Sequence, residues 1–381
     1  MKIGFFLENN KAGGLDTFVI NLLNYWPYRN DKLILFVNSN HPGLKNLRVL
    51  LNKNIKIKPY ANIIGKLNYN KLVKNILKFY YFKKNLNYIY KILKKSGAQR
   101  LLMIQGGYPG GQTSMAAVSA WNIISNYKPW FNFHNYVTPK IKIDLFRQFI
   151  DYNMKKKIKG FISVSKDCIK SIYPELIFRD KKKHFIYNGI KINSVKKKTI
   201  KKSRINLLML GVYEKRKGHS FLFEALKYLS KKKIDFQCSI YGDGNRDEIN
   251  IVYDQIPLDI KSKIKLYKHK NKINPIILDS DIVVVPSQNL ESFGYAALEA
   301  MVLKKPVIST NCGGLPEVVK NNYNGFVVNK KNYKEFAKKI YLLSNNKKLR
   351  LKMGQNGYER YLELFQAKDM SRKYSDLIKN D

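Results

Sequence analysis

Two glutamates in the second half of the chain have a spacing that could serve a single ligand. Glu291 and Glu299 form the two ends of the stretch ESFGYAALE. If a helix begins near Phe293 or Gly294, the two carboxylates lie about 10 Å apart along it and within about 80° of each other around it. Backbone N–H groups at a helix N-terminus suit a diphosphate, and carboxylates suit hydroxyl groups on either side of it. The stretch therefore fits a ligand that contains a sugar, a diphosphate and a ribose. Alternatively, Glu291 is an ordinary carboxylate at a helix N-terminus and Glu299 is exposed to solvent.

Other candidate positions lie in loops that follow predicted strands. In a parallel α/β sheet, ligands bind at the carboxyl ends of the strands, and glycine there lets the backbone approach a ligand closely. Taken alone, such a glycine pair can equally be a plain strand-to-helix turn, and a histidine there can be a satisfied strand-end residue. The loops of this kind are Gly13-Gly14, Gly106-Gly107, the loop at His134, 211–218, 291–294 and Gly313-Gly314.

The elements that must position these loops alternate between strand and helix. The first half has the predicted strands KIGFFLE, DKLILFV, RLLMIQG, WFNFHN and GFISVS. The pattern starts again near Ile205 with INLLMLG, DFQCSIYG, KIKLYK, DIVVVPS and KPVIST. Such alternation predicts two doubly wound α/β domains in succession. We place an N-terminal domain at 1–190, a lysine-rich linker at 191–204, a C-terminal domain at 205–360 and a C-terminal helix at 361–381 that returns toward the N-terminal domain.

Size and composition agree with this division. The chain has 381 residues, and this length exceeds what a single hydrophobic core usually holds. Hydrophobic residues make up 45% of the chain, which is enough to form cores. Its cysteines, Cys168, Cys238 and Cys312, form no C-x-x-C motif, which argues against a disulfide framework or a zinc site. The first apolar run is too short for a signal peptide, and no segment approaches about 18 uninterrupted apolar residues. We therefore expect a cytoplasmic protein.

The positive charge of the chain is unevenly distributed. The formal net charge is +44, and residues 1–202 hold 39 Lys and Arg against 8 Asp and Glu. No acidic residue lies between Asp31 and Asp144, so this part would be attracted to phosphate-bearing surfaces. The alternative is compositional drift, because the chain is also rich in Asn, Ile and Tyr.

Residues 66–95 are the strongest candidate for such a surface. They combine nine lysines with apolar positions at helical spacing and with the block FYYF at 79–82. A basic helix with exposed aromatic side chains can lie in the interface of an anionic membrane. It can also be a surface helix whose apolar stripe faces the core. We expect contact with the membrane, at its cytoplasmic face.

A longer passage around the two glutamates resembles a known family. DIVVVPSQNLESFGYAALEAMVLKKPVISTNCGGLPEVVKNNYNGFVV is similar to the signature region of glycosyltransferase family 4, whose hallmark is a glutamate, seven residues and a second glutamate. Weaker similarity at FISVSK, IYNGI, GVYEKRKGH and YGDGN extends over nearly the whole chain. The resemblance implies the GT-B fold, in which two Rossmann-like doubly wound domains face each other across a cleft. It also implies a retaining sugar transfer.

The resemblance assigns roles in the C-terminal half. Glu291 matches the glutamate that contacts the transferred sugar, Glu299 the one that holds the ribose, and Lys217 the lysine that pairs with the diphosphate. Many relatives carry a second phosphate-binding arginine where this chain has Val212. The candidates for its role are Lys215 and Arg216. The backbone that would approach the donor belongs to Ser292, Phe293 and Gly294.

In the N-terminal half the resemblance points to four residues. Gly13 and Gly14 match the loop that closes on the diphosphate. Asp16 stands where relatives have an acidic residue that meets the acceptor. His134 matches the histidine near the donor sugar.

The implied reaction is a sugar transfer from a nucleotide-diphosphate sugar, with UDP the first expectation for the nucleotide and GDP the second. The acceptor would be a hydroxyl of a glycan or a lipid-linked intermediate of cell-surface polysaccharide, such as lipopolysaccharide or capsule. The resemblance implies that no cofactor is required, since fixed dipoles and Lys217 would stabilise the leaving diphosphate. Asp279-Ser280-Asp281 precedes its apolar strand and makes a poor metal triplet. The partners expected are the donor, the acceptor and an anionic membrane surface, with no nucleic acid. Alternatives are a basic binding module without catalysis and a sugar-nucleotide epimerase of the same fold.

Overall fold

The computed structural model describes residues 1–62, 71–139, 144–191, 204–232, 234–270 and 272–380. The chain folds into two compact units. Unit 1 is Met1–Gly189 with Ala367–Asp381, and unit 2 is Ile190–Gln366. The predicted linker at 191–204 lies outside the described residues except for its two end residues.

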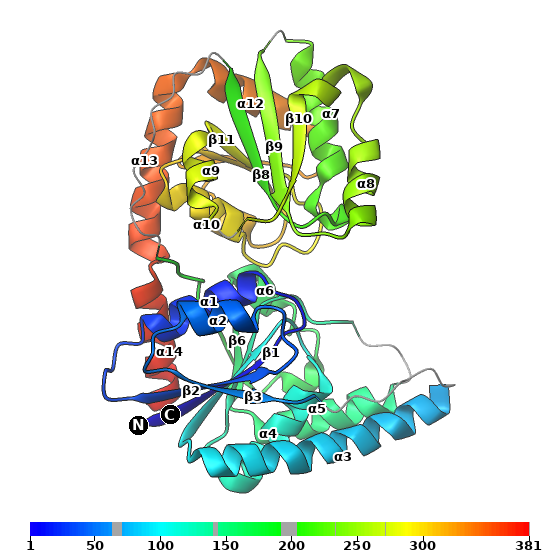
Figure 1. Ribbon diagram of the computed structural model, residues 1–381, viewed down its shortest axis with the longest axis vertical. Helices are drawn as coiled ribbons and strands as arrows, with labels where there is room; N and C mark the ends of the chain where they lie inside the picture. Colours follow the sequence, from blue (N-terminus) through cyan, green and yellow to red (C-terminus); the bar gives the residue numbers. More distant parts are fainter. Residues whose placement is uncertain (63–70, 140–143, 192–203, 233, 271, 381) are drawn as a thin grey trace. The chain divides into compact units, whose positions relative to one another are not determined.

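Unit 1 is a parallel sheet with helices on both faces (Figure 1). Helices α1 and α2 cover one face, and α3, α4 and α5 cover the other. The strands are β1 (Lys2–Glu8), β2 (Lys32–Asn38), β3 (Lys56–Tyr60), β4 (Arg100–Gln105), β5 (Trp130–Phe133), β6 (Gly160–Ser163) and β7 (Lys182–Phe185). The helices are α1 (Gly14–Asn24), α2 (Leu44–Leu50), α3 (Lys71–Ser96), α4 (Gln112–Ile124), α5 (Leu145–Lys157), α6 (Lys166–Lys170) and α14 (Ala367–Lys379).

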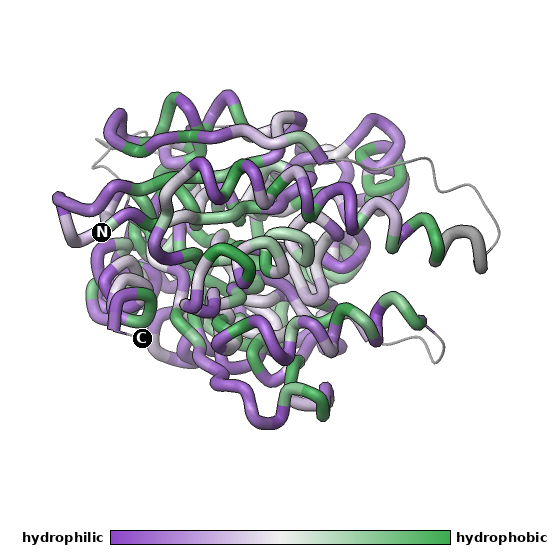
Figure 2. The backbone as a smooth tube through the Cα atoms, turned by 90° about the horizontal axis from the view of Figure 1, so that it is seen from below, coloured by the Kyte–Doolittle hydropathy of each residue, from purple (hydrophilic) through white to green (hydrophobic). Residues whose placement is uncertain are grey.

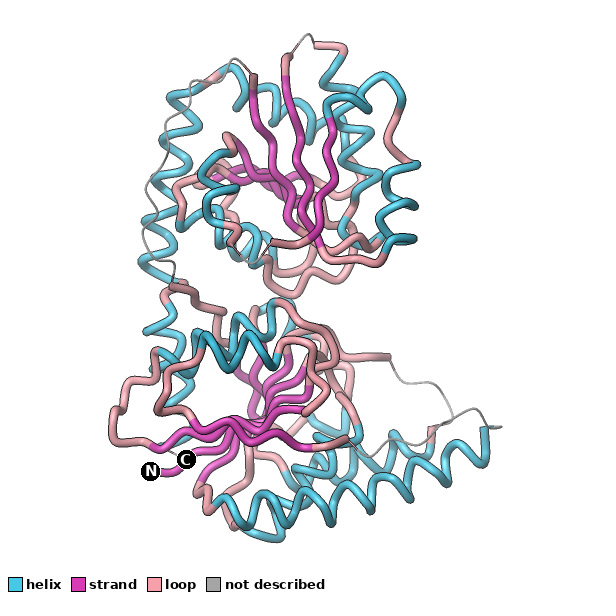
Figure 3. Tube along the Cα trace, in the orientation of Figure 1, coloured by secondary structure: helices cyan, strands magenta, loops and turns pink. Residues whose placement is uncertain are grey.

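Unit 2 repeats the arrangement with six parallel strands (Figure 3). Its strands are β8 (Ile205–Leu210), β9 (Phe236–Gly242), β10 (Ile264–Lys268), β11 (Ile282–Val285), β12 (Val307–Thr310) and β13 (Gly325–Val328). Its helices are α7 (His219–Ser230), α8 (Arg246–Asp254), α9 (Asn274–Asp279), α10 (Tyr295–Val302), α11 (Leu315–Val318), α12 (Tyr333–Asn345) and α13 (Lys347–Leu364). The predicted fold class, two doubly wound α/β sheets, is confirmed.

The sequence pattern accounts for these layers. Strands that are covered on both faces have continuous apolar runs, because a parallel sheet buries both of its sides. Strand β11 is IVVV, and β1 is apolar between Lys2 and Glu8. The outer helices alternate between hydrophilic and hydrophobic residues along the chain (Figure 2). On α1 the hydrophobic residues Phe18, Val19 and Leu22 are buried.

Each sheet has one point where the strand order reverses. In unit 1 the order is β3-β2-β1-β4-β5-β6-β7, so the reversal lies between β1 and β4. In unit 2 the order is β10-β9-β8-β11-β12-β13, and the reversal lies between β8 and β11. Ligands of open α/β sheets bind outside the carboxyl ends of the strands at such a point. These two edges are where a site is expected.

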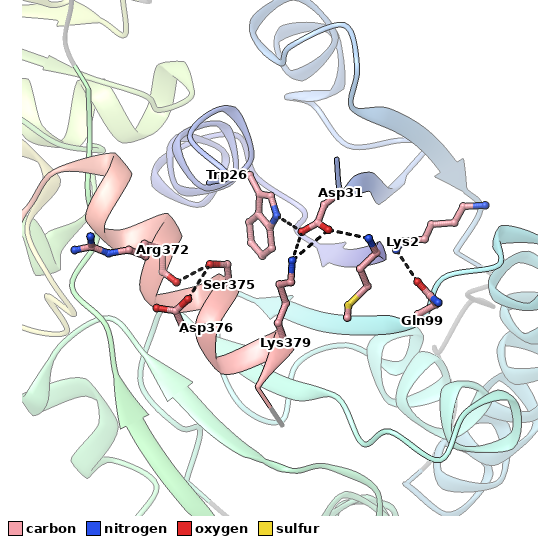
Figure 4. A network of polar contacts seen from close by, with 9 residues as sticks. Lys2, Trp26, Asp31, Gln99, Arg372, Ser375, Asp376 and Lys379 are labelled. Carbon is pink, nitrogen blue, oxygen red and sulfur yellow. Dashed lines mark hydrogen bonds and ion pairs between the residues drawn. The ribbon is translucent and has the colours of Figure 1, made fainter. Parts of the chain in front are cut away.

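The C-terminal helix packs on unit 1, and its start differs from the predicted residue 361. The chain remains in unit 2 through α13, because Phe365 is buried against Phe293, with 5.8 Å between the ring centroids. Helix α14 then begins at Ala367. Its last turn is held by Asp31, which accepts hydrogen bonds from Lys379 and from the Trp26 indole (Figure 4). The predicted boundary therefore moves to Gln366 in the structure.

Candidate functional site

The centre of the candidate site in unit 2 is an ion pair between Lys217 and Glu291. The Lys217 Nζ atom lies 2.6 Å from Glu291 Oε2. The Ser287 hydroxyl donates to the same oxygen at 2.8 Å. Lys217 ends the short helix after β8, and Glu291 lies in the loop after β11. The two residues thus come from the two strands that flank the reversal point, although 74 residues separate them in the chain.

Two glycines let these loops pack closely. Gly218 follows Lys217 with φ of 79°, and a Cβ atom there would overlap the carbonyl group of Pro286. Gly294 has φ of 106°, and a Cβ atom there would overlap the side chain of Leu315. Side chains other than hydrogen are strained at such φ values, so glycine fits both backbone positions. A larger residue at Gly218 would clash with the backbone of the loop after β11, so the two loops could not meet in this way.

The environment of Glu291 keeps its carboxylate charged. Burial by itself opposes the charged form, but the charge and hydrogen bond of Lys217 outweigh it, together with the Ser287 hydroxyl and the nearby charge of Arg216. The net result is a pKa below the usual range for glutamate. Glu291 therefore presents a fixed negative charge that is already neutralised by a cation.

Glu299 has the opposite environment. It lies on α10, it is half-buried, and it makes no hydrogen bond or ion pair with any residue that the structure describes. Loss of water around the carboxyl raises its pKa to about 7. Such a group gains much from a polar partner, and a vicinal diol such as ribose supplies two hydroxyl donors.

The helix that carries Glu299 begins close to the start considered from the sequence, Phe293 or Gly294. Gly294 is the N-cap of α10 and Tyr295 is its first residue. Glu291 therefore lies in the preceding loop, so the helical spacing assumed between the two glutamates does not hold. Ser292 and Phe293 also lie in this loop, and Phe293 is buried. The left-handed conformation at Gly294 turns the chain out of the helical path, and the tertiary pairing with Lys217 sets the position of Glu291.

Arg216 is the better placed of the two candidates for the missing arginine. Its Nε atom donates to Glu214 Oε2 at 2.6 Å, and its charge contributes to the lowered pKa of Glu291. Lys215 is exposed. Val212 is half-buried and has no cationic group to offer.

In unit 1, Gly13 and Gly14 form the turn from β1 into α1. Gly13 is the N-cap of α1 with φ of 153°, and no heavy atom would lie within 4 Å of a Cβ atom there. Gly14 is the first residue of the helix. The Gly13 amide donates to the Asp16 carboxylate at 3.3 Å, so Asp16 caps the start of the helix from its third position.

Asp16 is largely enclosed by protein groups. Its Oδ1 atom lies 2.9 Å from His41 Nε2 and 3.3 Å from Asn9 Nδ2. Its side chain is 11% exposed. Asp16, for which an acceptor contact was predicted, thus already accepts hydrogen bonds at both carboxylate oxygens from groups of the protein. His41 was missed by the sequence analysis, because nothing in the pattern marks a histidine in the turn after β2.

His134 lies in the loop after β5, next to α1. Its ring centroid is 4.2 Å from that of Phe18. Burial lowers the pKa of His134 to about 3, so the ring is neutral at physiological pH. Its Nε2 atom lies 2.6 Å from Asn132 Oδ1. The Nδ1 atom of this neutral ring is then a hydrogen-bond acceptor.

The orientation of Asn132 supports this assignment of the ring. The Asn132 amide group donates to the Tyr374 hydroxyl at 2.8 Å and to the Ile162 carbonyl at 3.3 Å. Its carbonyl oxygen therefore faces His134, which must donate from Nε2. Asn132 and Tyr374 were also missed, because Tyr374 is on α14, 242 residues away in the chain.

The structure thus groups the predicted site residues within each unit. Unit 2 holds Arg216, Lys217, Glu291, Ser292, Phe293, Gly294 and Glu299, and unit 1 holds Gly13, Gly14, Asp16 and His134. Within the described part of the chain, no three His, Cys, Asp or Glu side chains gather as a metal site would require.

Comparison with known proteins gives a family match in unit 2. Residues 191–360 match the family model described as Glycosyl transferases group 1. An uncharacterized glycosyltransferase of Methanocaldococcus jannaschii is 35% identical over 157 residues, which are 40% of this chain and 42% of that protein. A capsular polysaccharide biosynthesis glycosyltransferase, CapM of Staphylococcus aureus, is 28% identical over 174 residues, 45% of this chain and 46% of that protein. The chain therefore spans less than half the length of these curated relatives.

Solved structures agree over the full length. A glycosyltransferase from Rickettsia africae has a TM-score of 0.78 at 22% identity, and the match covers 100% of this chain and 98% of that one. HepE of Anabaena, solved in complex with UDP, has a TM-score of 0.72 at 17% identity and 99% coverage of both chains. The fold is accordingly that of the GT-B glycosyltransferases.

Proposed function

We propose that this chain is a glycosyltransferase that moves a sugar from a nucleotide-diphosphate sugar to a hydroxyl group of an acceptor. The observation that carries the proposal is the Lys217–Glu291 pair with Glu299 nearby in sequence, within the region that matches the family model. A basic binding module would have no use for a neutralised buried carboxylate at Glu291 and a carboxyl of raised pKa at Glu299. An epimerase would need further acid and base groups.

The donor would be bound by complementary groups of unit 2. Lys217 and Arg216 supply positive charge for the diphosphate, and the amides from Ser292 to Gly294 supply hydrogen-bond donors. Glu299 accepts from the ribose hydroxyls. Glu291 meets the sugar and exchanges part of its bond to Lys217 for one to a sugar hydroxyl.

The reaction breaks the bond between the anomeric carbon and the diphosphate oxygen, and it forms a bond from that carbon to the acceptor oxygen. The acceptor hydroxyl loses its proton to the departing diphosphate oxygen, so atoms and charge balance. We propose that the anomeric configuration is retained by attack on the same face. Lys217 stabilises the charge that develops on the leaving diphosphate, and no cofactor is required. His134, neutral and accepting at Nδ1, would receive a hydrogen bond from a sugar hydroxyl.

The proposed nucleotide is UDP, with GDP as the second choice. The complex of HepE with UDP supports UDP on a similar fold. The proposed acceptor is a glycan or a lipid-linked intermediate of cell-surface polysaccharide, such as lipopolysaccharide or capsule. The name of the relative from Staphylococcus aureus, which refers to capsular polysaccharide, supports this class.

A test of the donor site is a thermal-shift series without added metal. Wild type and Glu299→Ala would be heated with UDP, GDP, ADP, CMP and the corresponding sugars. We expect one nucleoside diphosphate to stabilise the wild type, by about 2.7 kcal/mol at 100 times its dissociation constant. Glu299→Ala would lose most of that shift. Glu363→Ala, an exposed position on α13, is the matched control. No shift with any nucleotide would reject the proposal.

We further propose that the protein is cytoplasmic and meets the inner face of the membrane through α3. No helix among the described residues is long and apolar enough to span a membrane. On α3, Ile76 is 61% exposed and Tyr80 is 49% exposed. Phe82 of the aromatic block belongs to the core instead, because it is buried. Phe79 is 37% exposed, and its ring packs on Phe146. The contact would therefore rest on Ile76, Tyr80 and the surrounding lysines.

A further inference from the structure

Unit 1 contains a cavity of about 180 Å³ that the proposed function does not use. Arg100 is the first residue of β4, Trp130 is the first residue of β5, and Lys159 directly precedes β6. All three line the cavity, so it lies at the amino ends of these strands. His134 follows the other end of β5, where the loops of the candidate site are. The four residues of β5 span roughly 13 Å, and this length separates the cavity from those loops.

The side chains around the cavity concentrate positive charge. Arg100, Lys128 and Lys159 line it, and none of its lining side chains within the described ranges is acidic. The positive charge is also felt beside the cavity, because the pKa of Lys181 is lowered first by burial and next by the charge of Lys128. A hollow surrounded by charge of one sign attracts ions of the opposite sign. The cavity therefore suits an anion.

Arg100 gives the cavity its most specific feature. The guanidinium lies over the ring of Tyr127, with 3.4 Å between Cζ and the ring centroid. One terminal nitrogen donates to the carbonyl oxygen of Gln99 at 3.1 Å. The Nε atom is buried and has no hydrogen-bond acceptor in the described part of the structure. A buried donor without an acceptor is unfavourable, so the guanidinium would gain from an acceptor atom that enters the cavity.

Hydrogen bonds within unit 1 hold the walls of the cavity in place. The Trp121 indole donates to the carbonyl oxygen of Tyr127 at 2.6 Å, which fixes the loop before β5. The Trp130 indole donates to the carbonyl oxygen of Leu377 on α14 at 3.2 Å. The next residue, Ile378, is buried and lines the cavity. The cavity is therefore formed without a ligand, and binding requires little ordering of the protein.

We propose that this cavity binds a small phosphate ester. The phosphate group would be held by Arg100, Lys128 and Lys159, and the organic part would lie against Trp130 and Ile378. Arginine pairs with a phosphate group through two N–H groups, and lysine pairs with it as a point charge. A volume of about 180 Å³ is below the roughly 300 Å³ at which pockets for drug-sized ligands begin, which excludes a nucleotide sugar. This site is separate from the donor site and does not depend on the transferase assignment.

The first experiment measures the binding of glycerol 3-phosphate to the full chain by calorimetry. Wild type should bind this ester and should not bind glycerol. Lys128→Gln, at an exposed position, should weaken binding about tenfold, and Arg100→Gln should weaken it at least as much, because each removes a charged donor to the phosphate. Lys45→Gln removes the same charge at an exposed position of α2 and should leave binding unchanged. No binding to wild type, or equal weakening in Lys128→Gln and Lys45→Gln, would overturn the proposal.

A second measurement locates the ligand within unit 1. The chain has three tryptophans, so the indole N–H signal of Trp130 can be assigned by NMR with Trp130→Phe as the reference. Glycerol 3-phosphate should shift this signal. It should leave the signal of Trp26, whose indole donates to Asp31, unchanged. An equal response of the two signals would indicate non-specific attraction of the anion and would reject the cavity as the site.

A third comparison identifies the source of the ester. Glycerol phosphate occurs as a free compound and as the headgroup of phosphatidylglycerol. Displacement of glycerol 3-phosphate by phosphatidylglycerol vesicles, and not by phosphatidylcholine vesicles, would support the headgroup as the ligand. Retention in the presence of both kinds of vesicle would support a free ester in the same cavity. If UDP and GDP fail to bind wild type, the proposed function fails, and the binding of glycerol 3-phosphate still decides whether the cavity is a site.

Discussion

At the scale of single residues, unit 2 holds two glutamates in opposite electrostatic states. Lys217 pairs with Glu291 and holds its pKa low, whereas Glu299 is half-buried without a partner among the described residues and has a pKa of about 7. Burial alone raises the pKa of a carboxyl, and a nearby cation lowers it. One glutamate is thus permanently charged, and the other changes charge near neutral pH.

The raised pKa of Glu299 predicts a pH-dependent stability. The folded protein holds this proton more tightly than the unfolded chain, so the contribution of Glu299 is largest below about pH 4.5 and is lost as the pH rises through about 7. Glu299→Gln should therefore be more stable than wild type at pH above 7, by at most about 3 kcal/mol. Urea unfolding at low and high pH measures this difference. Glu363→Gln is the exposed control, and an equal response of both variants would contradict the prediction.

The Lys217–Glu291 pair predicts a different response. Lys217→Ala leaves the Glu291 carboxylate buried without its cation, which should cost roughly 3 kcal/mol of unfolding free energy. Glu291→Gln in the same chain removes the stranded charge and should recover part of that loss. A double-mutant cycle based on denaturant unfolding gives the interaction free energy between Lys217 and Glu291. Additive effects of the two substitutions would mean that the pair makes no net interaction. Transfer activity should be lost in both single variants.

At the scale of elements, the candidate site of unit 2 depends on short turns, and the proposed membrane-binding surface of unit 1 depends on the long helix α3. Gly218 and Gly294 hold left-handed conformations where loops from β8 and β11 meet. Helix α3 spans 26 residues and packs on α4, so much of its apolar content serves the core of unit 1. Ile76 and Tyr80 remain exposed on the same surface as several lysines.

This surface predicts binding to anionic vesicles. Replacing Ile76 and Tyr80 together by serine should weaken sedimentation with phosphatidylglycerol vesicles by at least about tenfold, because burial of both side chains in the interface is lost. Binding should also decrease with salt, since each lysine near an anionic surface contributes about 1 kcal/mol. Tyr253→Ser, at an exposed aromatic position of unit 2, is the control. Equal binding of the double variant and wild type would exclude α3 as the contact.

At the scale of the whole molecule, two units with separate cores are joined by two crossings of the chain. The crossings lie at 189–190 and 366–367. Helix α14 carries Tyr374 back to Asn132 and thereby to His134 in unit 1. The residues proposed for the nucleotide and most of the phosphate contacts lie in unit 2. Binding should therefore stabilise unit 2 directly, by mass action.

Hydrogen exchange with mass spectrometry can test whether the nucleotide stabilises unit 2 directly. UDP should slow exchange in 211–218 and 287–299 of unit 2, because the proposed contacts with the nucleotide and the diphosphate lie there. The outer helix α8 should exchange at the same rate with and without UDP, which gives an internal control. Protection confined to the basic residues of α3 would instead indicate non-specific attraction of an anion.

The sequence by itself determined the fold class and most of the candidate residues. Alternating apolar strands and amphipathic helices require parallel sheets, and the spacing from Glu291 to Glu299 is a local pattern in the chain. The sequence also predicted that Lys217 and the glycine loops follow strands, as they do in the structure. These features can be read because each depends on neighbours within a few residues.

Tertiary structure alone decided which groups are paired and charged. The pairing of Lys217 with Glu291, the enclosure of Asp16 by His41 and the link from Tyr374 to His134 join residues that are far apart in the chain. The start of α14 at Ala367 was also decided by tertiary structure, because Phe365 packs on Phe293 in unit 2. Protonation depends on burial and on such distant neighbours, so the pattern of residue types along the chain could not reveal it.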